Sequence, residues 1–223
     1  MFKLIKESHG DYPKQFSQCT ATEAEFAKYF HNVYNANQIT LANSFYEICS
    51  GMGVDYNKMK NTLKNRSNIN FQYLECNKNF RGFGGVCLPK DTKQLSSQLQ
   101  TMDLVSPIIS SIDESNKTRK KTIFQYISSI NPKSIGIYSL EMKLGSSNSR
   151  EAAILDIINL LKNEKVKIYL FNPNRIPNNL SLNEEISLSE FIKKSEIIIA
   201  NRIPKELEEY SHKVFSRDVF YRD

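Results

Sequence analysis

The hydrophobic pattern of this 223-residue chain changes at Asn131–Pro132, and this change limits the folds that the chain can adopt. Before that point, apolar residues recur every three or four positions, which is typical of amphipathic helices. After it, β-rich runs such as Ser134–Leu140 and Lys165–Phe171 flank an apolar helical segment. A strand–helix–strand order predicts a parallel sheet with right-handed crossovers. We therefore expect an all-helical part followed by a small α/β part.

Caps and spacing set the expected bounds of the elements. Thr20 or Thr22 can cap the first long helix, and acidic residues in its first turn favour the helix dipole. The helix ends near Gly51, and the Asn-rich stretch 65–85 has little periodicity, which predicts a loop. In chain order, the further elements are helices over 55–63, 89–99, 107–130, 150–161 and 187–194 and strands over 134–140, 165–171, 196–200 and 213–215.

The charge balance permits a polyanionic partner. Thirty Lys and Arg against 24 Asp and Glu give a net charge of +6, and the surplus is larger in the first hundred residues. Nucleic acid, an acidic membrane surface or a phosphorylated small molecule would all suit it. The basic residues are scattered, which argues against nucleic acid. A Lys-rich solvated surface that reflects only codon usage explains the same numbers.

Four cysteines stand far apart, without a C-x-x-C pair or a histidine at metal-ligand spacing. We therefore expect neither a disulfide framework nor a metal site. The longest aliphatic run, Ile197–Ala200, is too short to span a bilayer, and the first residues lack the apolar region of a secretory signal. The expected protein is soluble and cytoplasmic, with no membrane partner.

The stretch Gly82–Asp91 (GFGGVCLPKD) carries the clearest chemical signal. Its glycines allow tight turns and close approach of a ligand to the backbone. Pro89 favours the first turn of a helix, so Cys87 would lie at or beside the N-cap, where the dipole and Lys90 favour a thiolate. Asp91 falls on the same face and could activate a water that cleaves a thioester. The alternative is a glycine turn before a capped helix with a buried cysteine.

A second pair lies on the first long helix. Lys28 and Asn32 are four residues apart and project together. The lysine could extend its charged end into solvent beside Phe and Tyr side chains. It could equally stabilise a developing oxyanion together with the amide of Asn32.

Together these residues resemble a family. The segment Glu23–Asn32 (EAEFAKYFHN), the stretch Gly82–Asp91 and the ending Ser216–Asp223 (SRDVFYRD) are similar to the nucleotide-sugar 6-dehydrogenases, the UDP-glucose/GDP-mannose dehydrogenase family. Gly136–Lys143 (GIYSLEMK) and the pair Arg150–Glu151 agree with its short bacterial form. The Pro-Lys-Asp after the cysteine speaks against the N-acetyl-mannosaminuronate branch. GDP-mannose stays a weaker option than UDP-glucose.

The resemblance implies an NAD-dependent, two-step oxidation of the sugar C6 alcohol through a thiohemiacetal and a thioester on Cys87. It implies that Lys28 and Asn32 stabilise oxyanions and that Asp91 assists proton transfer. The implied substrate-binding residues are Gly82, Phe83, Gly84, Gly85, Lys143, Arg217 and Glu25, and the implied cofactor contacts are Lys90 and Arg150. It also implies a homodimer built on helix 22–50.

Two departures from the family pattern matter. The arginine that the family sends into the partner subunit's site has no clear counterpart, and Arg66 is the candidate. The family's N-terminal NAD-binding domain, with its G-x-G-x-x-G fingerprint after a strand, has no match. We therefore expect residues 1–19 to be a remnant of that domain, 20–131 a helical central domain and 132–223 a UDP-binding α/β domain.

Two function classes follow from the missing fingerprint. The chain could be part of a UDP-glucose 6-dehydrogenase that needs a separate NAD-binding polypeptide. It could instead be a non-catalytic module that binds a UDP-sugar or dimerises. A basic nucleic-acid binder is a third reading, and salt-dependent retention on a polyanion resin would test it.

Overall fold

The first half of the chain is helical. The computed structural model describes residues 17–71, 73–76, 82–84, 87–140, 153–162, 164, 166–173, 182–184, 187–201 and 203–216. The described residues of its first half form the helices α2 (Ala21–Gly51), α3 (Tyr56–Thr62), α4 (Cys87–Thr101) and α5 (Pro107–Ser129). Thr20 caps α2 through a capping box with Glu23, and Asp55 caps α3, so both helices begin where their side chains satisfy free backbone N–H groups.

The second half forms a parallel sheet of five strands in the order β3-β2-β1-β4-β5. The strands are β1 (Ser134–Tyr138), β2 (Lys167–Phe171), β3 (Asn183–Glu184), β4 (Ile197–Ala200) and β5 (Val214–Ser216). The helices between them are α6 (Ala153–Leu161), α7 (Leu188–Lys194) and the 3-10 helix η1 (Lys205–Lys213). This order reverses direction at β1, as in doubly wound nucleotide-binding folds.

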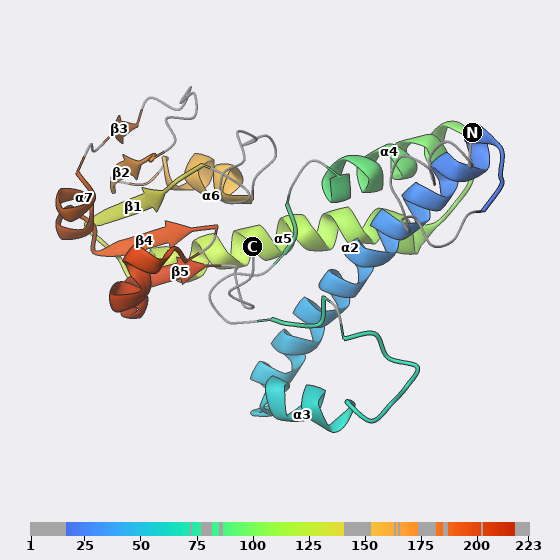
Figure 1. The fold of residues 1–223 in the computed structure, drawn as a ribbon, viewed down its shortest axis with the longest axis horizontal. Helices are drawn as coiled ribbons and strands as arrows, with labels where there is room; N and C mark the ends of the chain where they lie inside the picture. Colours follow the sequence, from blue (N-terminus) through green and yellow to red (C-terminus); the bar gives the residue numbers. More distant parts are fainter. Residues whose placement is uncertain are drawn as a thin grey trace, which may run out of the picture.

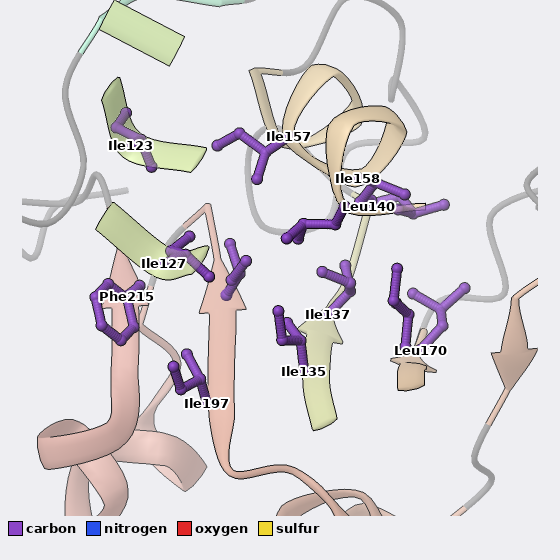
Figure 2. Close-up of a cluster of buried hydrophobic side chains, with 13 residues drawn as sticks. Ile123, Ile127, Ile135, Ile137, Leu140, Ile157, Ile158, Leu170, Ile197 and Phe215 are labelled. Atoms are coloured by element: carbon purple, nitrogen blue, oxygen red, sulfur yellow. The ribbon is translucent and has the colours of Figure 1, made fainter. Parts of the chain in front are cut away.

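Each face of the sheet carries its own apolar core. Along β4, Ile197 and Ile199 pack toward α5 and α6, whereas Ile198 and Ala200 pack toward α7 and η1. This alternation follows from the two-residue period of a strand. Figure 2 shows the larger core, in which Ile157 of α6 and Ile127 of α5 face the sheet. On the opposite face, Gly136 of β1 leaves the space that Phe191 and Ser195 occupy, since a Cβ there would lie 2.3 Å from Ser195 Oγ.

Helix α5 belongs to both halves of the molecule. Its first part, with Ile112, packs in a cluster with Val33 and Ala36 of α2 and with Phe83. Its last part, with Ile123 and Ile127, packs on the sheet. Figure 1 shows α5 running from the sheet at one end of the molecule to α2 and α4 at the other. The helical half and the α/β half therefore share one continuous helix.

The expected fold class is confirmed: helices come first and a Rossmann-like parallel sheet follows. Helix α4 begins two residues before the expected start at Pro89, so Cys87 is its first residue. The expected list did not include β3 or η1. The proposed division into domains at residue 131 stays a prediction.

Candidate active site

A buried carboxylate joins α2 to α4. The side chain of Asp91 has no exposed surface, and Asn32 Nδ2 donates a hydrogen bond of 2.5 Å to its Oδ2. Lys90 Nζ lies 3.0 Å from Oδ1, and Lys28 Nζ lies 4.0 Å from Oδ2. A buried charge needs such partners, because an unpaired carboxylate would lose its hydration without compensation. The structure therefore brings together Lys28, Asn32 and Asp91, as expected from the sequence.

Cys87 lies next to this group at the start of α4. Its side chain is exposed, whereas Cys49 and Cys76 are buried. Pro89 occupies the first turn and is buried, which fits its fixed φ angle and missing N–H group. The alternative of a buried cysteine at this position is wrong. A nucleophile must reach its substrate, and the exposed thiol meets that requirement.

The two lysines differ in what they contact. Asp91 raises the pKa of Lys90, first through their hydrogen bond and then through its negative charge. The Lys28 side chain is 58% exposed and reaches Asp91 only at ion-pair distance. Lys28 therefore has ammonium donors free to contact a ligand beside Cys87.

Glu25 lies one turn before Lys28 on α2 and lines a different space. A pocket of about 430 Å³ opens between the first turns of α2 and the later part of α4, and its lining includes Glu25, Phe26 and Tyr29 on one side and Gln94 and Ser97 on the other. The pKa of Tyr29 is raised, chiefly by burial and then by the negative charge of Glu25. Among the described residues, Asp91 pairs with Asn32, Lys28 and Lys90, and Glu25 lies nearby on the other side of Tyr29.

The glycine segment, described at residues 82–84, is held against α5 by an amide side chain. Asn116 Oδ1 accepts a hydrogen bond of 2.8 Å from Phe83 N–H, and Asn116 Nδ2 donates one of 2.9 Å to the Phe83 carbonyl. Gly82 has φ +97, and a Cβ there would lie 2.8 Å from Asn116 Oδ1. The position therefore requires glycine for its backbone angle and for space.

Phe83 was expected to contact the substrate, but its side chain is buried in the helical half. Its side chain has no exposed surface and packs with Val33, Ala36 and Ile112. Its backbone N–H and C=O both face Asn116. Contacts to a substrate from this segment would therefore come from the glycines on either side.

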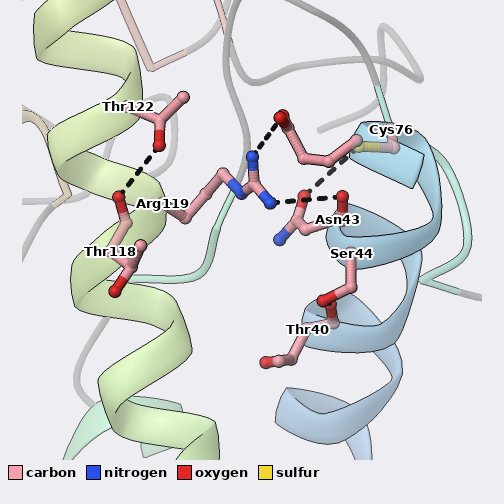
Figure 3. Close-up of polar contacts among 8 residues, drawn as sticks. Thr40, Asn43, Ser44, Cys76, Thr118, Arg119 and Thr122 are labelled. Atoms are coloured by element: carbon pink, nitrogen blue, oxygen red, sulfur yellow. Dashed lines mark hydrogen bonds and ion pairs between the residues drawn. The ribbon is translucent and has the colours of Figure 1, made fainter. Parts of the chain in front are cut away.

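A second contact fastens α5 to α2 one turn further on. Arg119 contacts the carboxylate of Glu47 and donates to the carbonyl of Asn43 at 3.2 Å (Figure 3). The amide oxygen of Asn43 accepts from Cys76 Sγ at 3.2 Å. Asn116 and Arg119 are three residues apart, so the same stretch of α5 holds both the glycine segment and α2.

Several expected site residues lie elsewhere. Arg66 is exposed and follows α3, which packs on the last turns of α2, whereas Lys28 lies near the start of α2. Its reach into a partner's site stays a prediction. Gly85, Lys143, Arg150 and Arg217 lie outside the described residues.

The carboxyl edge of the sheet is the second place where a ligand could bind. Ser139, Asn172, Asn201 and Ser216 directly follow or end the strands β1, β2, β4 and β5 and are buried. Ligands of doubly wound sheets bind at this edge, where the strand order reverses. Lys143 and Arg217 follow β1 and β5 in the chain, and the carboxyl ends of both strands lie on this edge.

Among the described residues, no group of three or more His, Cys, Asp and Glu is placed to hold a metal ion. The described helices also include none with the length and apolar character needed to cross a membrane.

Sequence reasoning missed Asn116 and Arg119. Both occupy positions in the stripe Ile109, Ile112, Asn116, Arg119, Ile123, Ile127, which repeats every three or four residues along α5. Polar side chains within an apolar stripe indicate buried polar contacts. That signal was available in the sequence, although it could not identify the partners.

Known proteins resemble this chain in sequence and in fold. Residues 22–118 match the sequence model of the UDP-glucose/GDP-mannose dehydrogenase family, central domain. UDP-glucose 6-dehydrogenase of Campylobacter jejuni is 35% identical over 204 residues, which are 90% of this chain and 51% of the relative. GDP-mannose 6-dehydrogenase of Pseudomonas aeruginosa is 26% identical over 77% of this chain and 39% of that protein. The chain thus spans about half the length of the UDP-glucose relative.

A solved structure shows the same fold. It is a UDP-glucose dehydrogenase from the hyperthermophilic archaeon Pyrobaculum islandicum, with a TM-score of 0.68 and 22% identity. The match covers 80% of this chain and 43% of that structure. The Asp91 group (Lys28, Asn32, Lys90 and Asp91) lies on α2 and α4. Helix α2 begins one residue before the matched range 22–118, and α4 lies within it. Through this central domain, the chain belongs to the UDP-glucose/GDP-mannose dehydrogenase family.

Proposed function

We propose that this chain carries the substrate-binding and cysteine-bearing part of a UDP-glucose 6-dehydrogenase. The observation that supports this most directly is the group around Asp91, which joins Asn32, Lys28 and Lys90 beside the exposed Cys87. UDP-glucose is preferred to GDP-mannose because the UDP-glucose relative is 35% identical and the GDP-mannose relative 26% identical.

In the proposed reaction, oxidation of the C6 alcohol removes a hydride and a proton and leaves an aldehyde. The thiolate of Cys87 adds to the aldehyde carbon, which gives a thiohemiacetal. Loss of a second hydride from that carbon gives a thioester. Water then attacks the thioester carbon, the C–S bond breaks, and the products are the carboxylate of UDP-glucuronate and the regenerated thiol.

The side chains around Asp91 suit these steps. Lys28 is largely exposed and can place its ammonium beside the oxyanion that forms at each addition. Asn32 uses one N–H of its amide for Asp91 and retains the other for the same oxyanion. Asp91, one turn after Cys87, would accept the proton of the attacking water.

NAD would be held mainly outside this chain. Lys90 fits a supporting phosphate contact, since its side chain is 48% exposed and, among the described residues, its ammonium pairs with Asp91. Arg150 would be the second contact. Residues 1–223 lack the glycine-rich turn after a strand that binds a pyrophosphate, so an NAD-binding part outside these residues would supply it. When bound, NAD supplies the acceptor for the hydrides.

The UDP group would lie at the carboxyl edge of the sheet. Lys143 and Arg217 follow strands that end on this edge, and their charges suit a diphosphate. Gly82, Gly84 and Gly85 would contact the sugar between this edge and Cys87, and Glu25 would contribute from α2.

The partner of α2 would be a second copy of this chain. A stripe of exposed apolar side chains runs along the whole helix: Phe26, Phe30, Tyr34, Leu41, Phe45, Ile48 and Met52. Their spacing of three, four or seven residues puts them on one face. A groove of about 380 Å³ between α2 and α3 continues the stripe at Tyr34, Leu41 and Phe45. A monomeric protein rarely exposes so continuous an apolar face.

Titration calorimetry with UDP-glucose tests the function. The chain should bind UDP-glucose, Cys87→Ser should bind it with similar affinity, and Asp91→Ala should weaken binding by disturbing Lys28 and Asn32. NADH should form only after addition of a polypeptide with an NAD-binding domain, and Cys87→Ser should then abolish it. NADH formation by the purified chain alone would contradict the need for that polypeptide.

A non-catalytic UDP-sugar-binding or dimerising module is the second candidate. It is favoured by the exposed apolar stripe of α2, which suits dimerisation. Under this reading Cys87→Ala has no phenotype, whereas Lys143→Ala abolishes function.

A further inference from the structure

Outside the Asp91 group, Asn116 makes a two-point contact with the backbone of Phe83. Asn116 is 3% exposed, and both atoms of its amide are used: one accepts from Phe83 N–H and the other donates to Phe83 C=O. A two-point contact fixes the orientation of the peptide as well as its position. Loss of one partner would leave buried backbone groups unsatisfied.

The rest of the surroundings keep Asn116 in place. Arg119, three residues further on, holds the same stretch of α5 to Glu47 and Asn43 of α2. The Phe83 side chain packs with Ile112, which is one turn before Asn116. Gly82 leaves the space beside Asn116 Oδ1, so that the glycine approaches α5 closely.

Phe83 lies four residues before Cys87, the first residue of α4. The backbone between them therefore starts from a fixed point on α5 and ends at the nucleophile. From these contacts we infer that Asn116 is a positioning residue: it orients the glycine segment toward the substrate and toward Cys87. This inference rests on the proposed function of that segment.

The chain offers a matched control. Asn43 is also a buried amide, 5% exposed, whose oxygen accepts a hydrogen bond from Cys76 rather than from the glycine segment. Asn43→Ala and Asn116→Ala should both lower stability, since each removes a buried hydrogen-bonding group. Only Asn116→Ala should change the glycine segment.

The experiment combines three measurements on the full chain in a Cys19→Ser background, because Cys19 is the other exposed cysteine of the described residues. Asn116→Ala should speed hydrogen exchange at the Phe83 amide at least tenfold, weaken UDP-glucose binding at least tenfold and change the rate of Cys87 alkylation by iodoacetamide. Asn43→Ala should leave all three within about twofold of the parent, a difference below 0.5 kcal/mol.

Asn116→Asp separates the two hydrogen bonds. It keeps an acceptor for Phe83 N–H and replaces the donor to Phe83 C=O by a carboxylate oxygen. Because that oxygen would face the Phe83 carbonyl as a buried, unpaired acceptor, the effects of Asn116→Asp should be at least as large as those of Asn116→Ala. Equal affinity and equal alkylation rates in the parent and Asn116→Ala would overturn the inference, even if the Phe83 amide exchanged faster.

Failure of the proposed function gives a different result. If the parent chain does not bind UDP-glucose, that function fails, and exchange at Phe83 with alkylation at Cys87 still decides the role of Asn116. Faster exchange with a changed alkylation rate then supports positioning of the thiol, and an unchanged alkylation rate overturns it.

Discussion

The two halves of the molecule bury their apolar residues differently. Among the described residues, all 14 exposed large apolar side chains precede Asn131. The α/β half instead packs its apolar residues into two cores, one on each face of the sheet. The helical half also buries charged groups, Lys60 and Asp91, whereas the buried polar residues described in the α/β half are Ser and Asn. The described part of the α/β half keeps its apolar residues covered, with help from Ile123 and Ile127 of α5, whereas the helical half has surfaces suited to a partner and a ligand.

The largest expected effect is in the α/β core. Phe191 has no exposed surface and packs among Tyr138, Ile198 and Leu207. Phe191→Ala should lower the free energy of unfolding by about 3–5 kcal/mol, because it removes apolar burial and leaves a cavity. Val105→Ala, at a side chain 88% exposed in the helical half, should change it by less than about 0.5 kcal/mol. Urea denaturation measures both, and similar losses would break the contrast.

The second prediction concerns the apolar stripe of α2. Leu41→Glu should weaken self-association about a hundredfold or more, because a symmetric interface would bury the charge twice. Sedimentation velocity at several concentrations measures this change. Ser50→Glu, at an exposed position outside the stripe, should leave the association unchanged. A parent chain that is monomeric at high concentration would refute the interface.

One glycine in each half gives a smaller predicted change in stability. Gly136→Ala should destabilise the α/β half by about 1–3 kcal/mol, since its Cβ would overlap Ser195 and Phe191 of α7. Gly51→Ala, at the last residue of α2, meets no atom within 4 Å and should stabilise the helix by up to about 1 kcal/mol. Thermal unfolding measures both, and the same sign for the two variants would contradict the expected packing.

The smallest effect is the pH dependence of the Lys90–Asp91 pair. The folded pKa of Lys90 is raised above 10.5 by Asp91. A raised pKa stabilises the fold below the unfolded value, and that contribution is lost as the pH rises through the folded value. Asp91→Asn should remove the contribution, so the stability difference between parent and variant should shrink above about pH 10.5. Urea denaturation of the parent and of Asp91→Asn from pH 9 to pH 11 measures this difference. If the two midpoints stay equally far apart over the whole range, the coupling is excluded.

Local signals in the sequence predicted most of the fold. The capping box of Thr20 and Glu23 defines the start of α2, and the run Ile197–Ala200 predicts a strand buried on both faces. The 3-10 helix η1 escaped prediction because it is short and mostly polar, with Leu207 as its one buried residue. The two-residue strand β3 is too short to have a pattern.

The site was predictable in part. Lys28, Asn32 and Asp91 were named from spacing and resemblance, and the structure brings them together. The hydrogen bonds of Asn116 with the Phe83 backbone could not be predicted, because Asn116 lies 33 residues further along the chain. Spacing on one helix predicts neighbours within a turn or two, whereas contacts between distant elements depend on how the helices pack.

The continuity of α5 has a consequence for dissecting the molecule. A protease cut or an expression boundary at residue 131, where the sequence pattern changes, would remove Ile123 and Ile127 from the α/β core. The released fragment would expose the sheet face that these side chains cover and should aggregate. A cut before Ser106 would leave α5 whole with the sheet but would detach the anchor of the glycine segment. Neither cut preserves both the α5 contacts to the sheet and the Asn116 contact to Phe83. The two halves should therefore unfold as one cooperative unit.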